Sequence, residues 1–259
     1  MLRAPGHRTF LFDAGSLVQK DIGRRIVSAY LDYRGISALE AIVASHNDTD
    51  HINGIPEILQ HCRVNHIYAP AIMIEQAHKD QGPAPWLESY LQMQDRTLER
   101  FPATPRADES PDSGLSIEQL WPVQGTATPR LSDNNASLVL LITYHHRTIL
   151  ITSDIEQGTQ QRLMTLYPDL QPDILLAPHH GSLTTLYDRF LSHLSPKTIL
   201  CSCGASAFKR GRVIATPTTF HTPRHGAITV TMPRRGRVTM EAWLSTPLTA
   251  DESSVEDAL

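Results

Sequence analysis

Short apolar runs alternate with amphipathic stretches over most of the chain. Residues 9–13 and 41–45 are compact apolar runs that end in turn-forming or polar residues, a pattern typical of buried strands. Residues 21–33 place apolar side chains at helical spacing and are followed by Gly35, so they predict a helix. The same patterns predict further helices at 54–60, 72–79, 86–101 and 184–194, and further strands at 64–68, 137–144, 147–153, 173–177, 198–202, 227–232 and 237–243.

The order of these elements predicts one domain of the α+β class. A chain of 259 residues can form one large domain with a full hydrophobic core, and neither an internal repeat nor an inter-domain linker divides it. Residues 102–114 are rich in Pro, Asp and Ser, which predicts an exposed loop. Residues 246–259 are acidic and carry few apolar side chains. We therefore expect a folded domain over residues 1–245, followed by a disordered acidic tail.

Composition and charge exclude several other classes of protein. Apolar residues make up 41% of the chain and charged residues 19%, which argues against disorder. The formal net charge of −4 excludes a wholly basic nucleic-acid coat, and three cysteines are too few for a disulfide scaffold. The first ten residues lack a secretory signal, and the best apolar run, SLVLLI, is far shorter than the roughly 20 residues that cross a bilayer. We expect a soluble, cytoplasmic protein.

One stretch of the chain is strongly basic. Residues 189–237 contain nine Lys and Arg side chains and no Asp or Glu, whereas the residues from Glu241 onward contain five acids and no base. A basic stretch of this kind can bind the phosphates of a nucleic-acid backbone. It can equally be a solvated sheet edge on which Lys and Arg discourage aggregation. The sequence leaves both alternatives open.

The segment that follows the strand at 41–45 has the composition of a metal site. It places four potential ligands within six residues, namely His46, Asp48, Asp50 and His51. Imidazole and carboxylate both bind divalent cations, and a loop at the carboxyl end of a strand is a common place for ligands. The alternative is a solvated turn in which Asp50 caps the next helix. Four ligands exceed what a cap needs, so the pattern favours a metal site.

Two later loops have the same character. Asp154 ends the strand at 147–153, and His179 and His180 follow the strand at 173–177 within the segment Pro-His-His-Gly-Ser. Taken alone, Asp154 could be a helix cap and the two histidines could be exposed turn residues. Three ligand-bearing loops that each follow a strand favour one shared site.

In this order, the three loops resemble the metallo-β-lactamase superfamily, and within it the C-terminal domain of the competence protein ComEC and its stand-alone relatives. That branch carries H-x-D-x-D-H-x-G-G, then N-N-x-S, T-G-D and P-H-H-G-S. The corresponding segments are residues 46–54, 134–137, 152–154 and 178–182, and the resemblance runs from about Arg8 to Val230. It implies a four-layer αβ/βα sandwich, in which two sheets pack face to face with helices outside.

The resemblance also implies a dinuclear centre with two divalent metal ions, manganese, zinc or magnesium. His46 and Asp48 would hold the first ion and Asp50 and His51 the second. The remaining metal ligands of this dinuclear centre would be Asp154 and His179. Asp154 would bridge the two ions, and His179 would complete the second site.

Several positions depart from the family pattern. In the family, the first ion normally takes a further His from the segment at 132–135, which has no His in this chain. Either Asp133 or Asn135 replaces that ligand, or the first site is weaker. Asn53 replaces the first Gly of the G-G pair, and Ser153 replaces the Gly before Asp154. A late motif that usually ends in Asn ends here in Ala207. Nothing resembling the strand and Gly-rich turn that open the family precedes Met1, so we expect a shortened variant or a late start.

The ligand types favour a phosphodiester substrate. Asp48 in place of an imidazole hardens the site, which moves its preference from zinc towards manganese or magnesium. A hard, acid-rich pair of ions suits a phosphodiester better than an amide or a thioester. Asp50, His180 and Asn135 are the predicted catalytic residues, with His180 as general acid or phosphate donor and Asn135 as a hydrogen-bond donor to phosphate.

The sequence therefore predicts a metal-dependent hydrolase, a phosphodiesterase or nuclease that cleaves DNA with a hydroxide held by two ions. One alternative keeps the fold and hydrolyses small esters, lactones or thioesters; another is a metal-binding module without turnover. The expected partner is nucleic acid or another phosphodiester, and the family resemblance adds a membrane channel as a possible partner.

Overall fold

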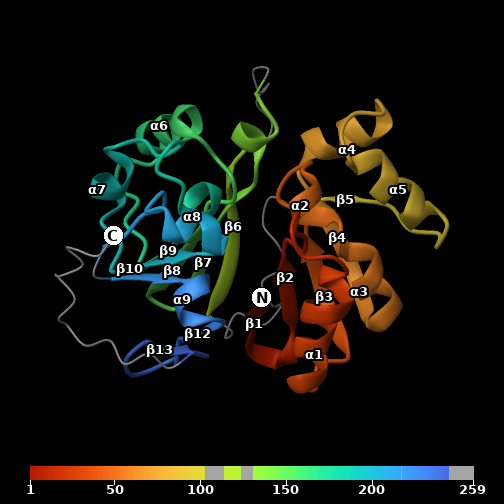
Figure 1. The fold of residues 1–259 in the computed structure, drawn as a ribbon, viewed down its shortest axis with the longest axis horizontal. Helices are drawn as coiled ribbons and strands as arrows, with labels where there is room; N and C mark the ends of the chain where they lie inside the picture. Colours follow the sequence, from red (N-terminus) through yellow and green to blue (C-terminus); the bar gives the residue numbers. More distant parts are fainter. Residues whose placement is uncertain (103–113, 124–130, 217, 245–259) are drawn as a thin grey trace, which may run out of the picture.

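The computed structural model describes residues 1–102, 114–123, 131–216 and 218–244, which form two main sheets (Figure 1). The predicted tail at 246–259 and nearly all of the predicted loop at 102–114 lie outside the described residues. The first sheet has the strand order β1-β2-β3-β4-β5, with β1 antiparallel to β2 and the other pairs parallel. Its strands are β1 Leu2–Arg3, β2 Thr9–Phe12, β3 Ala38–Val43, β4 Arg63–Ala69 and β5 Glu99–Arg100.

The second sheet has the order β11-β10-β9-β8-β7-β6. The β6–β7 and β7–β8 pairs are antiparallel, and β8, β9, β10 and β11 are parallel to one another. Its strands are β6 Leu115–Trp121, β7 Val139–Tyr144, β8 Arg147–Ile151, β9 Ile174–Leu176, β10 Thr198–Cys201 and β11 Thr219–His221. A separate antiparallel hairpin joins β12 Ile228–Thr231 to β13 Thr239–Ala242.

Helices cover the outer faces of the two sheets (Figure 1). Those of the first half are a π-helix Gly23–Ser28 that continues into α1 Ala29–Tyr33, then α2 Thr49–Ile52, α3 Ile55–His61, α4 Ala71–His78 and α5 Ala84–Gln92. Those of the second half are α6 Gln157–Leu166, α7 Phe190–Leu194, α8 Ala205–Lys209 and α9 Thr222–His225. Short 3-10 turns lie at Pro5–His7, Asn134–Ala136 and Pro178–Gly181.

The cores show why the chain forms four layers. Alternate residues of β3 point in opposite directions, as the pleat of a strand requires. Ala41 and Val43 lie in the cluster that joins the two sheets, with Ile117 and Leu140 of the second sheet. Ile42 packs on the other side, against the helices of the first half. The predicted α+β sandwich of four layers is thereby confirmed.

Each strand predicted from the sequence has a counterpart, but two predicted helices are too long. The helix expected at 86–101 ends at Gln92, and Glu99–Arg100 is the strand β5 beside β4. The chain reverses at Asp95, whose φ is 55°, and Glu88 Oε2 then accepts a hydrogen bond from the Leu98 amide at 2.9 Å. The helix expected at 184–194 covers only Phe190–Leu194.

Several elements were not predicted from the sequence: the short β1, β11, α2, α8 and α9, and the longer β6 and α6. In β6, Leu115 and Ile117 are buried and alternate with the exposed Ser116 and Glu118, so a period of two was present and overlooked. Helix α6 buries mostly polar side chains, which gives no apolar period to detect.

Candidate metal centre

The carboxyl ends of four strands meet at one edge of the two sheets. There β2 ends before Asp13 and β3 before Ser45, while β8 ends before Asp154 and β9 before the turn Pro178–Gly181. Within each sheet the two strands concerned are parallel, so their carboxyl ends lie at the same edge. Loops that are far apart in the sequence therefore present polar side chains to a common space.

Six of the predicted residues converge in this space. His46 Nε2 lies 3.3 Å from Asp48 Oδ2 and His51 Nε2 lies 3.5 Å from Asp154 Oδ2. His180 Nε2 lies 3.5 Å from Asp154 Oδ2 and 3.9 Å from Asp50 Oδ2. Two overlapping triads have their ligand atoms within 4.8 Å of one another: His46, His51 and Asp154, and Asp50, His51 and His180.

The chemistry of this cluster fits divalent cations. Nε2 of His46 and Nε2 of His51 are both buried and have no hydrogen-bond partner among the described residues. A buried polar atom without a partner is costly, and it requires an explanation such as an ion. Asp154 is also buried, with 6% of its surface exposed. Imidazole nitrogens and carboxylate oxygens that face one another in this way are the ligand set of a divalent metal.

Asp13 and Ser45 fix the orientation of both buried imidazoles. Asp13 Oδ2 accepts hydrogen bonds from His51 Nδ1 at 2.9 Å and from Ser45 Oγ at 2.8 Å, and Asp13 Oδ1 accepts one from the Ser45 amide at 2.7 Å. Because the Ser45 hydroxyl donates to Asp13, it accepts from His46 Nδ1, at 2.9 Å. Both rings thus carry their proton on Nδ1 and present Nε2 to the cluster, as metal-binding histidines do. From the sequence alone, Asp13 was predicted only as the end of the strand at 9–13.

The carboxylates control the charge of the cluster. Burial lowers the pKa of His51, but the charges of Asp13 and Asp154 outweigh burial and raise this pKa to about 11. Burial raises the pKa of Asp154, but the close contact with His51 and the charge of His180 lower it to about 2. Burial also raises the pKa of Asp13, and the contacts with His51 lower it below its usual value. A cation bound at His51 Nε2 would replace the proton on that nitrogen as the partner of Asp154. The proton on His51 Nδ1 would stay hydrogen-bonded to Asp13.

Asp48 and Asp50 lie at the start of helix α2. Asp48 occupies the N-cap position, yet its side chain makes no capping hydrogen bond, and Asp50 lies in the first turn. The close contact with His46 lowers the pKa of Asp48 despite its partial burial. The N-cap position of the next helix, α3, is Gly54. The alternative in which Asp50 caps the following helix therefore finds no support.

The turn Pro178–Gly181 separates the two adjacent histidines. His179 and His180 have φ values of 46° and 57°, a left-handed conformation that costs a non-glycine residue about 1–3 kcal/mol. His180 Nδ1 donates to the Ser202 carbonyl at 3.0 Å, so its Nε2 points into the cluster. His179 Nδ1 instead lies 4.0 Å from Glu156 Oε1, and His179 is outside both ligand triads. The structure thus places His180, the predicted acid, in a candidate ligand triad and leaves His179 outside both, although His179 Nδ1 is buried and has no hydrogen-bond partner among the described residues.

The segment before β7 faces away from the cluster. Asp133 accepts a hydrogen bond from Gln76 of helix α4. The Asn135 amide donates to Ser132 Oγ at 3.0 Å and to Glu156 Oε2 at 2.9 Å, and Asn135 Oδ1 accepts from the Glu156 amide at 3.2 Å. Neither Asp133 nor Asn135 belongs to a ligand triad. Both donors of the Asn135 amide are already used, so it presents none of them to a phosphate.

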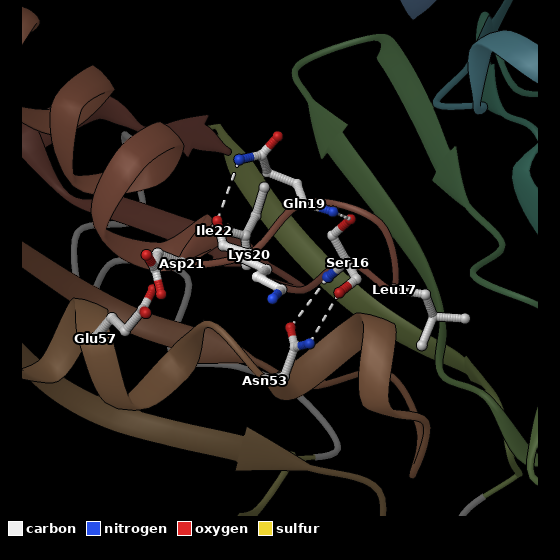
Figure 2. A pocket seen from close by; sticks show the side chains of 8 residues that line it. All are labelled: Ser16, Leu17, Gln19, Lys20, Asp21, Ile22, Asn53 and Glu57. Atoms are coloured by element: carbon white, nitrogen blue, oxygen red, sulfur yellow. Dashed lines mark hydrogen bonds between the residues drawn. The ribbon is translucent and has the colours of Figure 1, made fainter.

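Two departures from the family pattern have local explanations. Ser153 adopts a φ of 46°, which glycine adopts more easily, and its hydroxyl donates to the Leu138 carbonyl at 2.8 Å. Asn53 has a φ of −68°, so no glycine is required there. Its amide holds Ser16, with Asn53 Oδ1 accepting from the Ser16 amide at 3.0 Å and Nδ2 donating to the Ser16 carbonyl at 2.9 Å (Figure 2). The small polar pocket in Figure 2 is lined by Asn53 and contains none of the cluster ligands.

The fold and the site together define a class of protein: a two-sheet sandwich with a His and Asp cluster for divalent cations at one edge. Residues 1–204 match the family model described as the Metallo-beta-lactamase superfamily, and the chain belongs to this superfamily, whose members are generally metal-dependent hydrolases. The resemblance predicted from the sequence is confirmed.

The chain is also similar to three longer bacterial proteins. It is 28% identical over 183 residues to ComE operon protein 3 of Bacillus subtilis, which covers 71% of this chain and 22% of that protein. It is 25% identical over 242 residues to the uncharacterized protein YcaI of Escherichia coli, covering 93% and 28%, and 26% identical over 205 residues to the competence protein ComA of Neisseria gonorrhoeae, covering 78% and 25%. The chain thus spans about a quarter of the length of these relatives.

Among its described helices, none has the length and apolar character needed to cross a membrane.

Proposed function

We propose that this chain is a metal-dependent phosphodiesterase that hydrolyses DNA. The observation that carries the proposal is the composition of the cluster, in which three carboxylates, those of Asp48, Asp50 and Asp154, face three imidazoles. So many oxygen ligands favour hard cations such as Mn²⁺ and Mg²⁺, which offset the charge of a phosphodiester. The name of one relative, a competence protein, supports DNA as the substrate.

In this proposal His46 and Asp48 would hold one ion, Asp50, His51 and His180 would hold the other, and Asp154 would contribute a charged ligand to the same cluster. The ions would supply Lewis-acid polarisation of the phosphoryl group and a water activated for attack. The chain's own residues fix the geometry, since Asp13 and Ser45 hold the imidazole rings and the Ser202 carbonyl holds His180. Rigid ligands of this kind preorganise a site for its charged transition state.

The two histidines of the turn exchange roles relative to the expectation from the sequence. His180 becomes a ligand, and His179 becomes the proton donor. As a water molecule adds to phosphorus and releases one proton to solvent, the bond to the sugar oxygen breaks. That oxygen takes a proton from His179, which regains one from solvent. Glu156 Oε1 lies 4.0 Å from His179 Nδ1, an ion-pair distance that would favour the protonated ring, and Asn135 holds Glu156. Asn135 is therefore a positioning residue in this proposal.

Separate substitutions of the two histidines test this exchange. His180→Gln is expected to lower the affinity for one ion by at least about tenfold. His179→Gln is expected to keep both ions and to slow DNA cleavage about 100-fold. It should slow hydrolysis of bis(p-nitrophenyl) phosphate far less, because p-nitrophenolate leaves without a proton. Calorimetric titration with Mn²⁺ and the two rates provide the measurements. Loss of an ion in the His179 variant, with both ions kept in the His180 variant, would restore the assignment made from the sequence.

The proposed function is tested with metal-depleted protein that is reloaded with Mn²⁺, Mg²⁺ or Zn²⁺. Hydrolysis of both bis(p-nitrophenyl) phosphate and a DNA oligonucleotide, faster with Mn²⁺ or Mg²⁺ than with Zn²⁺, is the expected result. Hydrolysis confined to esters, lactones or thioesters would replace it with the small-molecule alternative. Bound metal without hydrolysis of any substrate in the panel would indicate a binding module. A membrane-channel partner stays a prediction from the resemblance.

A further inference from the structure

The nine basic residues of the stretch 189–237 do not form one surface. Lys197 Nζ lies 2.6 Å from Asp173 Oδ1, so this charge is paired with an acid outside the stretch. Arg234, Arg235 and Arg237 lie in the connection between β12 and β13. A third group, Lys209, Arg210 and Arg212, lies at the end of helix α8 and directly after it. We call this third group the cationic rim.

The cationic rim is attached to the turn that carries His180. The amide of Leu183 donates to the Arg212 carbonyl at 3.1 Å, and the amide of Ile214 donates to the Gly181 carbonyl at 2.8 Å. Between these two bonds, Ser182 forms an antiparallel bridge with Val213. At the other end of the segment, His180 Nδ1 donates to the Ser202 carbonyl. Both ends of the 202–214 segment, which carries the rim, are therefore held by residues 180–183.

The rim is also an uncompensated positive charge. All three side chains are exposed, and within the described parts of the chain none of them forms an ion pair with a carboxylate. The segment from Cys201 to Ile214 contains no Asp or Glu. On a chain with a net charge of −4, three unpaired cations beside a cluster of carboxylates form a local site for anions.

We propose that the cationic rim binds the phosphate backbone of DNA on one side of the scissile bond, an inference that rests on the proposed function. Leu183, which pairs with Arg212, is three residues from His180, and this limits the backbone separation to about 10 Å. One strand of DNA carries a phosphate about every 3.4 Å along its axis, so a strand that passes through the cluster can present several phosphates to the rim. Three cations within four residues are more than one phosphate requires. Together they can contact several consecutive phosphates of a DNA strand.

A triple substitution with a matched control tests this proposal. The rim variant is Lys209→Ser, Arg210→Ser and Arg212→Ser, and the control is Arg234→Ser, Arg235→Ser and Arg237→Ser, which removes the same charge from exposed positions. In Figure 1 the β12–β13 hairpin lies at the bottom of the view, below both α8 and α2. Binding of a fluorescent 20-nucleotide DNA is followed by anisotropy in Ca²⁺ buffer over a range of salt, and cleavage is followed with Mn²⁺.

The rim variant is expected to bind DNA at least about tenfold more weakly, with a salt slope reduced by about 2 to 3. Its KM for DNA should rise while kcat stays within about threefold, and the control should match the unsubstituted protein. Equal binding by the rim variant and the control would overturn the rim proposal. If the unsubstituted protein binds DNA through the rim but hydrolyses no phosphodiester, the proposed function fails and the rim assignment stands. Failure of the unsubstituted protein to bind DNA would remove both.

Discussion

Asp154→Asn is expected to lower the affinity for divalent cations by about 100-fold or more and to reduce hydrolysis to background. Asp154 belongs to one triad and contacts a member of the other, since its Oδ2 lies 3.5 Å from His51 Nε2, the residue that both triads share, and 3.5 Å from His180 Nε2. Asparagine keeps the volume but removes the charge, and a neutral amide is a poor ligand between two cations. Losing a group that binds a metal directly costs more than the 10- to 100-fold typical of an outer partner.

Calorimetric titration with Mn²⁺ and the rate on bis(p-nitrophenyl) phosphate measure this effect. Asp173→Asn is a suitable control, because Asp173 is paired with Lys197 and the Thr148 amide, outside the cluster. Asp48→Asn should have a smaller effect than Asp154→Asn, since the Asp48 side chain is 42% exposed and that of Asp154 only 8%. Thermal unfolding of the metal-free variants checks that each remains folded. Unchanged Mn²⁺ affinity in the folded Asp154 variant would remove this residue from the metal centre.

Gly15→Ala is expected to destabilise the fold by about 3 kcal/mol and to disrupt the metal loop. A Cβ at this position would lie 2.4 Å from the Asp50 carbonyl carbon, 2.5 Å from its oxygen and 2.7 Å from the His51 amide nitrogen. These are backbone atoms, and hydrogen bonds hold them in place, because the Ala14 amide donates to the His51 carbonyl and the Gly54 amide donates to the Ala14 carbonyl. Overpacking of this kind displaces the backbone.

Gly158→Ala provides the matched control. Gly158 lies in helix α6, and a Cβ there would meet no atom within 4 Å. Alanine is favoured over glycine in a helix, so this substitution should leave stability unchanged or raise it by up to about 1 kcal/mol. Denaturant unfolding measures both variants, and Mn²⁺ titration of Gly15→Ala should show weakened binding. Equal stability and Mn²⁺ affinity for the two variants would contradict the close approach of Gly15 to the metal loop.

The fold was largely predictable because its strands are short, apolar and followed by turns. The runs at 9–13 and 41–45 gave the parallel pair β2 and β3, and the runs at 137–144 and 147–153 gave the hairpin of β7 and β8. The errors occurred where the hydrophobic period is ambiguous. Leu98 and Phe101 are buried at helical spacing from α5, but the reversal at Asp95 directs them into the sheet. Tertiary contacts decided between two periods that the sequence allowed.

The sequence by itself determined which residues could form the site. His46, Asp48, Asp50 and His51 lie in one short loop after a strand, and Asp154 also follows a strand, so spacing alone indicated that their side chains would meet.

Only the tertiary structure decided which of the two histidines in the turn Pro178–Gly181 faces the cluster. His179 and His180 are adjacent and chemically identical, so no pattern along the chain distinguishes them. The Ser202 carbonyl directs one ring inward, and Glu156 lies beside the other. The same holds for the basic stretch. Backbone hydrogen bonds, such as the one from the Leu183 amide to the Arg212 carbonyl, hold Arg212 close to the turn that carries His180. A side chain's direction depends on backbone angles and on partners more than 20 residues away, and these exist only once the chain has folded.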